Sequence, residues 1–352
     1  MSSEIIKGRG AQLNTKNKFL SREFVTEHIE GIDEAFDENP KTTYFFEHSK
    51  TIVNKVNSPD IGPAYSMNPY QGCEHGCIYC YARNTHTYYG YSAGIDFEQK
   101  IIVKQNAPEI LEKTFDNPKW EPFPIMFAGN TDIYQPAERK FQITRKLLEV
   151  LLKYKHPVSM ITKNSLILRD LDLLQELTKY NLVHVNVSIT SLVEETRLAL
   201  EPRTATAKQR LKVVETLSKA GIPVNVMIAP IIPSINSHEI PQIMKQIADA
   251  GALSAAYTIV RLNGQIGEIF TDWIRKHHPD RAEKVLHQIQ DLHGGALNDS
   301  RYGTRMSGQG NYAKAIDMLF KSAKEKYLKG RIYPKLSTEH FKRPEKGQLK
   351  LF

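Results

Sequence analysis

Three cysteines are the residues best equipped for chemistry in this chain, and no others occur in it. Cys73, Cys77 and Cys80 follow the pattern C-x3-C-x2-C in the segment MNPYQGCEHGCIYCYAR. A disulfide framework would need an even, dispersed set of cysteines, so an odd and closely spaced trio indicates a metal or cluster site. Gly72 and Gly76 would let the backbone turn tightly enough for the three sulfurs to converge.

Two kinds of site are compatible with this spacing. Three thiolates on one loop can hold three irons of a 4Fe-4S cluster and leave the fourth iron open to an exogenous ligand. The alternative is a zinc site of Cys3His type, with His75 or His86 as the fourth ligand. Structural zinc sites usually have a second pair of ligands, which is missing here, and a ferredoxin-type carrier would need a fourth cysteine. We therefore favour the open cluster.

The elements that must position the cysteines alternate along the chain. Amphipathic helical stretches separate the later members of a series of β-rich runs, which are AYSMNPY, PFPIMFAG, PVSMITK, LVHVNVSIT, PVNVMIAP and SAAYTIVRL. Strands that alternate with helices predict right-handed βαβ units and a parallel sheet. The runs are apolar along most of their length, which predicts strands buried on both faces. We expect an α/β fold, a partial parallel (β/α)6 TIM-like barrel.

The chain divides into three expected regions. Residues 1–62 read as an N-terminal extension that wraps the body, residues 63–262 as the barrel, and residues 263–352 as a helical, basic C-terminal extension. Residues 321–350 hold ten basic and three acidic residues, and so carry +7 of the net charge of +8. Such a tail is compatible with a nucleic-acid contact. Combined with a zinc site, it would give the alternative function, a zinc-stabilised nucleic-acid-binding protein without catalysis.

The composition is that of a globular protein, with 41% hydrophobic and 24% charged residues. No apolar run approaches the ~20 residues that a membrane-spanning helix needs. The first residues, MSSEIIKGRGAQLNTKNKF, contain charges and no apolar signal core. We expect a cytoplasmic, monomeric protein without membrane contact.

The cysteine pattern, with the aromatic Tyr79 before its last cysteine and a position after the first strand of a partial barrel, resembles the radical S-adenosylmethionine (radical SAM) superfamily. Within it, the chain is similar to the spore photolyase-like branch of uncharacterised proteins. The segments that carry this similarity are NPYQGCEHGCIYCYAR, DFEQKIIVKQNAPE, AGNTDIYQPAER, ITKN, VSITS, LEPRTATAKQRL and NVMIAPIIP.

The resemblance implies an enzyme of lyase or oxidoreductase type with a 4Fe-4S cluster and S-adenosyl-L-methionine as cofactors. Reductive cleavage of S-adenosylmethionine would give methionine and a 5′-deoxyadenosyl radical, which abstracts a hydrogen atom from a substrate that the sequence leaves open, nucleic acid included. The electron would come from a one-electron reductant such as flavodoxin or ferredoxin.

The resemblance also assigns residues to the cofactors, most of them at the carboxyl ends of strands, where βα barrels build their sites. Cys73, Cys77 and Cys80 would bind the cluster. The expected cofactor contacts are Gly129, Thr131 and Asp132 near the methionine ammonium group, Lys163 at the carboxylate, Ser188 at the ribose or carboxylate, and Tyr79 with the Ile231 backbone beside adenine. The usual Gly-Gly-Glu is replaced by Ala-Gly-Asn-Thr-Asp at positions 128–132.

Several further polar residues are candidates for the site. No thiol remains once the three cysteines bind the cluster, so a protein hydrogen donor would be a tyrosine, with Tyr79, Tyr81 and Tyr134 the candidates. Arg261 and Asn225 are candidates for the substrate side. A second polar group, which is either an ion-pair network or a catalytic group, consists of Glu201, Arg203 and Arg210.

Overall fold

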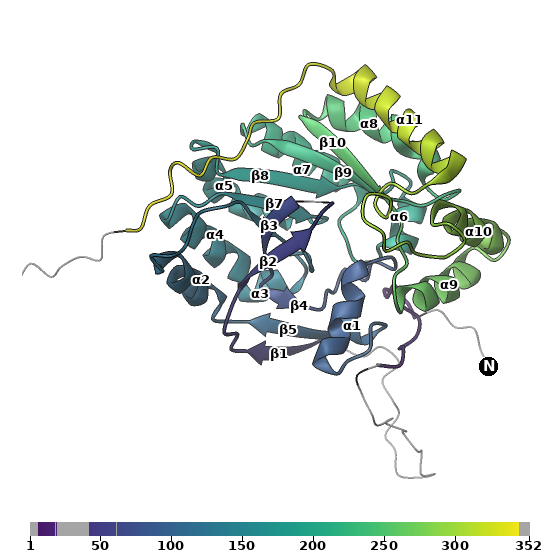
Figure 1. Ribbon diagram of the computed structural model, residues 1–352, viewed down its shortest axis with the longest axis horizontal. Coiled ribbons are helices and arrows are strands. Elements are labelled where there is room, and N and C mark those ends of the chain that lie inside the picture. The colour runs from purple at the N-terminus through teal and green to yellow at the C-terminus, as the bar shows by residue number, and fades with distance from the viewer. Residues whose placement is uncertain (1–5, 18, 20–41, 61, 345–352) are drawn as a thin grey trace, which may run out of the picture.

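The computed structural model describes residues 6–17, 19, 42–60 and 62–344, and its centre is a seven-stranded sheet (Figure 1). Six neighbouring strands run parallel, in the order β10 (Ser254–Ile259), β9 (Val224–Ile231), β8 (Val183–Ser188), β7 (Val158–Thr162), β6 (Ile125–Phe127) and β3 (Gly62–Met67). β2 (Val53–Ser58) pairs antiparallel with β3 at one edge. The six parallel strands confirm the predicted partial barrel.

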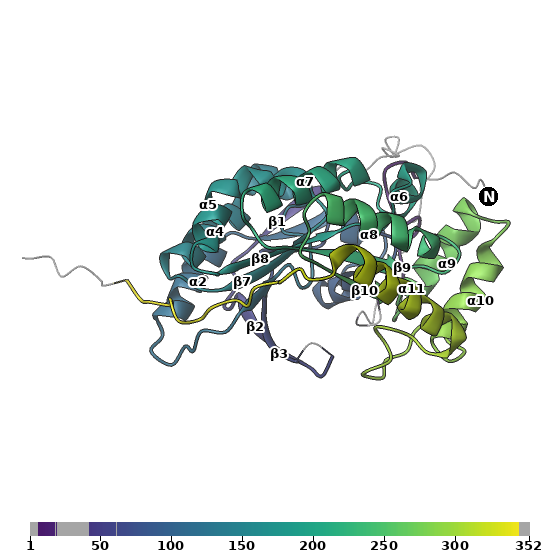
Figure 2. The same cartoon turned by 90° about the horizontal axis from the view of Figure 1, so that it is seen from above.

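Helices cover one face of this sheet, as Figure 2 shows from above. They are α4 (Ile143–Lys153), α5 (Leu171–Thr178), α7 (Ala207–Lys219) and α8 (Ile240–Asp249). The start of α7 is fixed by a capping box, in which Thr206 Oγ1 accepts from the Gln209 N–H and Gln209 Oε1 accepts from the Thr206 N–H. The apolar faces of these helices pack against the strands and form the core between them.

The inner face of the sheet departs from the sequence prediction. Ser159 and Asn186 on this face are half-buried and polar, whereas the intervening residues of β7 and β8 are buried. Asn225 Nδ2 donates to Asn186 Oδ1 at 2.9 Å, and Asn186 Nδ2 donates to Ser159 Oγ at 3.1 Å. The prediction of strands buried on both faces is wrong on this side, because six strands do not close a barrel and leave the interior partly open to water.

A second sheet, which the sequence did not reveal, carries the cysteine loop. Its strands have the order β1 (Thr43–Glu47), β5 (Lys100–Lys104) and β4 (Tyr70–Gln71). β1 is parallel to β5, and β4 is antiparallel to it. The loop with the cysteines leaves the end of β4, so this small sheet fixes its starting point.

The other helices are shorter or lie outside the barrel. They are the 3-10 helices η1 (Tyr81–Tyr89), η2 (Ser165–Asp170) and η3 (Ser237–Glu239), and the α-helices α1 (Asp96–Gln99), α2 (Ala107–Asp116), α3 (Ala137–Phe141), α6 (Glu194–Leu200), α9 (Ile266–His277), α10 (Ala282–Leu292) and α11 (Gly310–Leu328). Among the helices that the structure describes, none is long and apolar enough to cross a membrane.

Residues 331–344, here called the C-terminal strap, run from α11 back past the amino ends of the strands (Figures 1 and 2). The Ser337 N–H donates to the carbonyl of Asn181 just before β8, at 2.9 Å. The Lys342 N–H donates to the carbonyl of Tyr154 just before β7, at 3.1 Å. The strap therefore lies at the edge of the sheet opposite the carboxyl ends of the strands.

Candidate active site

The cysteine loop turns where two glycines adopt left-handed backbone conformations. Gly72 has φ of 81° and Gly76 has φ of 68°, in agreement with the tight turn that the sequence predicts. A Cβ atom on Gly72 would lie 2.9 Å from the carbonyl oxygen of Lys100, so β5 leaves no room for a side chain there. The Cys73 N–H donates to the carbonyl of Phe97 at 2.8 Å. These contacts hold the loop against the small sheet.

The three thiols share one environment in the interior. Cys73 and Cys77 are 7% and 8% exposed, and Cys80 is half-buried. Burial raises the pKa of the Cys77 thiol to about 12, against the influence of the Lys163 ammonium. Burial also raises the pKa of Cys73, and the charges of Asp132 and of the other two thiols raise it further. The Cys80 N–H donates to the Cys77 carbonyl at 3.3 Å, and Cys80 packs against both the apolar cluster that contains Cys73 and the one that contains Cys77.

The donor set fits an iron–sulfur cluster better than a zinc ion. Within the described part of the chain, no group of three His, Cys, Asp or Glu side chains is arranged to hold one metal ion. A 4Fe-4S cluster does not need that arrangement, because each thiolate binds a different iron. His75 Nδ1 lies 3.4 Å from Asp132 Oδ2, and His75 Nε2 lies 3.2 Å from Asn164 Nδ2, so both ring nitrogens already have partners. His86 is buried against the ring of Phe97.

A fully buried ion pair supports the cysteine loop. Arg83 and Glu98 are both 0% exposed, with Nη2 and Oε1 2.6 Å apart. Arg83 Nε donates to the Cys77 carbonyl at 3.0 Å, and the Glu98 carboxylate accepts from the N–H groups of Gly10 (3.1 Å) and Ala11 (2.7 Å). Sequence reasoning missed this pair, although both residues stand in segments that carried the family resemblance, CYAR and DFEQ.

Asp132 joins the cysteine loop to the end of β7. Its Oδ1 accepts from the Tyr134 N–H (2.9 Å) and from Thr162 Oγ1 (2.8 Å), and its Oδ2 accepts from the Lys163 N–H (2.7 Å) and lies beside His75. Burial opposes ionisation, but His75 and these hydrogen bonds outweigh it and lower the pKa of Asp132 to about 2. Groups of the chain thus occupy the roughly four acceptor positions of this carboxylate. Asp132 therefore positions His75 and the Lys163 backbone.

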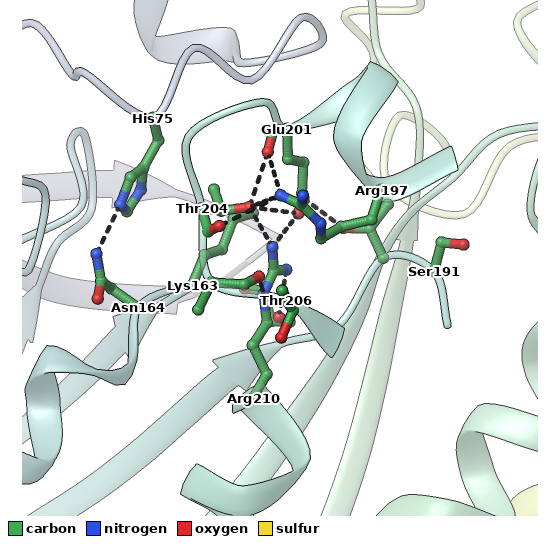
Figure 3. A network of polar contacts seen from close by, with 12 residues as sticks. His75, Lys163, Asn164, Ser191, Arg197, Glu201, Thr204, Thr206 and Arg210 are labelled. Carbon is green, nitrogen blue, oxygen red and sulfur yellow. Dashed lines mark hydrogen bonds and ion pairs between the residues drawn. The ribbon is translucent and has the colours of Figure 1, made fainter. Parts of the chain in front are cut away.

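Glu201 is the centre of the polar network shown in Figure 3. It accepts hydrogen bonds from Arg210 Nη2, from the Tyr79 hydroxyl and from Thr190 Oγ1, the last at 2.6 Å. Burial opposes its ionisation, but Arg210 and then Lys163 outweigh burial and lower the pKa of Glu201 to about 2. The predicted second polar group is therefore an ion-pair network, and it fixes the aromatic residue of the cysteine pattern.

Arg203 contacts the cysteine loop through its backbone, since its N–H donates to the His75 carbonyl at 3.3 Å. The backbone of α6 makes a similar contact, with the Ile78 N–H donating to the Leu200 carbonyl at 3.1 Å. The segment after β8 thus supports the cysteine loop through two backbone hydrogen bonds. The Nη1 atom of Arg203 is buried without a hydrogen-bond partner among the described residues.

Lys163 presents a charged group without a direct partner. Among the described residues, its Nζ atom has no hydrogen bond or ion pair, while its backbone carbonyl accepts from the Ala205 N–H at 3.2 Å. Burial opposes the ammonium charge, but the electrostatic interactions with Cys77 and Glu201 outweigh burial and raise the pKa of Lys163 above its ordinary value. The side chain is charged, held close to the cysteine loop and free to bind a ligand.

The segment after β6 meets the start of η1. The Tyr81 hydroxyl donates to the Gly129 carbonyl at 2.5 Å, and Thr131 Oγ1 donates to the Tyr70 carbonyl at 2.9 Å. Tyr81 is 56% exposed, so it lies at the surface of the site. The structure thus brings Gly129, Thr131 and Tyr81 together beside the cysteine loop.

The other predicted residues have different surroundings. The Ser188 carbonyl accepts from Arg210 Nη1 at 2.9 Å, and the Ile231 carbonyl accepts from the Val260 N–H at 3.0 Å. Tyr134 is completely buried, and its hydroxyl donates to Asp170 Oδ2 at 3.1 Å. None of its hydrogen bonds within the described chain reaches the cysteines. The roles of these residues stay predictions.

The basic C-terminal region uses part of its charge inside the molecule. Lys324, Arg331 and Arg343 donate to backbone carbonyls, namely those of Ala255 (2.9 Å), Ala252 (2.6 Å) and Phe115 (2.9 Å). The strap holds the last two of these side chains near the amino ends of the strands, at the edge of the sheet opposite the cysteine loop.

Fold and site together define a class of protein, a half-open parallel βα barrel with three cysteines on the loop that follows its first parallel strand. The chain belongs to the Radical SAM superfamily, whose family profile matches residues 67–247. Membership implies a 4Fe-4S cluster and S-adenosylmethionine as cofactors.

The relatives in sequence carry the name of uncharacterised proteins. An uncharacterised protein of Mycobacterium tuberculosis is 32% identical over 238 residues, which are 67% of this chain and 70% of that protein. An uncharacterised protein of Methanocaldococcus jannaschii is 27% identical over 237 residues, 67% of this chain and 84% of that protein.

Among solved structures, spore photoproduct lyase has the same fold, with a TM-score of 0.61 at 16% identity over 86% of both chains. One of these structures contains a dinucleoside spore photoproduct, and another contains S-adenosylmethionine as well. At this level of identity, the likeness shows the fold alone.

Proposed function

We propose that this protein is a radical SAM enzyme that binds a 4Fe-4S cluster through Cys73, Cys77 and Cys80 and cleaves S-adenosylmethionine reductively. The observation that supports this proposal best is the group of two buried cysteines and one half-buried cysteine on one loop, near the Lys163 ammonium, which has no hydrogen bond or ion pair among the described residues. When bound and reduced, the cluster supplies the electron that splits S-adenosylmethionine into methionine and a 5′-deoxyadenosyl radical, which abstracts hydrogen from the substrate.

The residues of the chain would bind and orient the cofactor in this proposal. Lys163 has the charge to bind its carboxylate, and Asp132 holds both the Lys163 backbone and His75 in place. Glu201 fixes Tyr79 between the second and third cysteines through the phenol hydroxyl. The Gly129 carbonyl and Thr131 border the same space, although Gly129 already binds Tyr81. A one-electron reductant of the flavodoxin or ferredoxin kind completes the proposed system.

Anaerobic reconstitution with iron and sulfide tests the proposal. We expect a brown protein with about four irons and four sulfides per chain, as the cluster stoichiometry requires, which forms 5′-deoxyadenosine after reduction. Lys163→Ala should raise the concentration of S-adenosylmethionine needed for half-maximal cleavage, while Lys153→Ala, at an exposed surface pair with Glu112, should not. A colourless protein with one zinc and no cleavage would instead support the alternative, a nucleic-acid-binding protein.

The substrate in this proposal is open, with nucleic acid as one candidate because of the fold shared with spore photoproduct lyase. Efficient repair of spore photoproduct is not expected, because the chain has three cysteines and the cluster uses all of them, so no thiol remains to return a hydrogen atom. Incubation with dinucleoside spore photoproduct, S-adenosylmethionine and reductant should give 5′-deoxyadenosine without thymine pairs. Multiple-turnover repair would show this expectation to be wrong.

A further inference from the structure

Arg261 lies at the edge of the sheet where the cysteine loop lies. It stands two residues after β10 ends at Ile259, on the far side of the open barrel from the strand that precedes the cysteines. The loop after Arg261 packs against η1, which begins at Tyr81, because Asn84 Nδ2 donates to the Asn263 carbonyl at 2.8 Å and the Gln265 N–H donates to Asn84 Oδ1 at 3.1 Å. The guanidinium therefore belongs to the mouth of the barrel interior.

The Arg261 guanidinium is half-buried and lacks a counter-ion. Among the described residues, no carboxylate lies within ion-pair distance of it, and its Nε atom is buried without a hydrogen-bond partner. Its one hydrogen-bond contact in the described chain is a weak one, from Nη1 to Met306 Sδ at 3.1 Å. The Asp60 carboxylate, whose charge acts on Arg261, is already bound by Arg305 and by the Gly303 N–H.

The two fully buried arginines of the site are paired. Arg83 binds Glu98, and Arg210 binds Glu201, and each also donates to backbone carbonyls. At Arg261 the neighbouring charge of Arg305 is repulsive instead, and with burial it lowers the pKa of Arg261. Among the described arginines, a buried side-chain nitrogen without a hydrogen-bond partner occurs at Arg203 and Arg261. A desolvated guanidinium nitrogen without a partner costs free energy, and such an exception points to a function.

We propose that Arg261 binds an oxyanion of the substrate, a phosphate or a carboxylate group, at the mouth of the barrel interior. The planar guanidinium has five donors and suits bidentate binding of either group. The Tyr81 hydroxyl, which donates to the Gly129 carbonyl just after β6, lies at the same carboxyl edge of the sheet. Asn225, the other residue predicted for the substrate side, pairs with Ser254 at the amino end of β10 and therefore lies away from Arg261. This inference rests on the proposed function, because it assigns the substrate side of the same site.

The test uses the full chain and thermal melting at constant ionic strength, with inorganic phosphate, a nucleoside 5′-monophosphate, the neutral nucleoside and N-acetylglutamate as probes. We expect an oxyanion probe to raise the melting temperature of the wild type and of Arg275→Gln, an exposed control on α9, and the neutral nucleoside to have no effect. In Arg261→Gln the rise should be lost, and in Arg261→Lys it should be partly kept. A larger effect of the phosphate probes than of the carboxylate would identify phosphate as the anion, and the reverse would identify carboxylate.

Equal shifts in wild type and Arg261→Gln would overturn the inference. So would a clear loss of stability in ligand-free Arg261→Gln with no shift in the wild type, because it would show that the arginine is structural. Arg261-dependent anion binding without any formation of 5′-deoxyadenosine by the wild type would contradict the proposed function instead, so the two failures are distinguishable.

Discussion

The two edges of the parallel sheet are held together by different interactions. At the carboxyl edge, beside the cysteine loop, buried arginines pair with buried carboxylates, as in Arg83–Glu98 and Arg210–Glu201. At the amino edge, Arg331 and Arg343 of the strap donate to neutral backbone carbonyls near the surface. A buried ion pair is expensive to desolvate and very sensitive to loss of one partner. The comparison therefore indicates that the buried ion pairs fix the geometry of the cysteine loop at the carboxyl edge, whereas the hydrogen bonds at the amino edge only attach the strap to the sheet.

Removal of a cysteine should have the largest effect on the carboxyl edge. Cys77→Ala leaves two thiolates on a loop that needs three, so we expect loss of the bound cluster and of S-adenosylmethionine cleavage. Iron and sulfide content and the yield of 5′-deoxyadenosine measure this. Full turnover in the variant would refute the ligand assignment.

Glu98→Gln should cost the most stability among variants that keep all three cysteines. The neutral amide leaves Arg83 without its charge partner. It also places an N–H donor against backbone N–H groups that donate to the Glu98 carboxylate in the wild type. We expect the free energy of unfolding to fall by about 3–5 kcal/mol. Chemical denaturation measures the free energy of unfolding. The control Glu112→Gln, at an exposed pair with Lys153, should cost less than about 1 kcal/mol, and equal costs would contradict the contrast between buried and exposed pairs.

Glu201→Gln should have a smaller effect, about 1–3 kcal/mol. Two of its partners are hydroxyls, Tyr79 and Thr190, which can rotate and accept from the new amide, while the amide oxygen still accepts from Arg210.

The pH dependence of the same variant sharpens this prediction. Because the folded-state pKa of Glu201 is lowered to about 2 from an ordinary value of 4.5, its stabilisation is complete above pH 4.5 and is lost as the pH falls toward 2. The difference in unfolding free energy between wild type and variant should therefore shrink over that range. Glu215 has a similarly lowered pKa because of its hydrogen bonds with the exposed Lys219 and Lys212. Glu215→Gln should nevertheless change the unfolding free energy only slightly, and added salt should remove that change. A constant difference for Glu201→Gln would contradict its assigned role.

The smallest effect is expected at the amino edge. Arg343 is exposed and donates to carbonyl groups that water can also satisfy, so Arg343→Gln should lower the unfolding free energy by about 1 kcal/mol or less. Cleavage of S-adenosylmethionine should be unchanged. Lys329→Gln, at an exposed pair with Glu325, is the matched control. A large loss of cleavage in Arg343→Gln would show that the strap acts on the site across the sheet.

Local spacing and periodicity determined much of this protein from the sequence alone. Cys73, Cys77 and Cys80 lie on one loop whatever the fold, because three and two intervening residues cannot carry them far apart. The six β-rich runs were confirmed as neighbouring parallel strands. The sequence could predict them because the spacing of apolar residues that distinguishes strands from helices is a local property of each segment. The place of Lys163 at a strand end followed from the same pattern.

Only the tertiary structure decided what surrounds the cysteines. Glu98 meets Gly10 across 88 positions, and Tyr79 meets Glu201 across 122, and no local period encodes such pairs. The small sheet of β1, β5 and β4 likewise joins segments far apart in the chain. The unpaired state of Arg261 is also a tertiary property, because a charge is satisfied or not by whatever packing brings near it, and the sequence lists the charge without its neighbours.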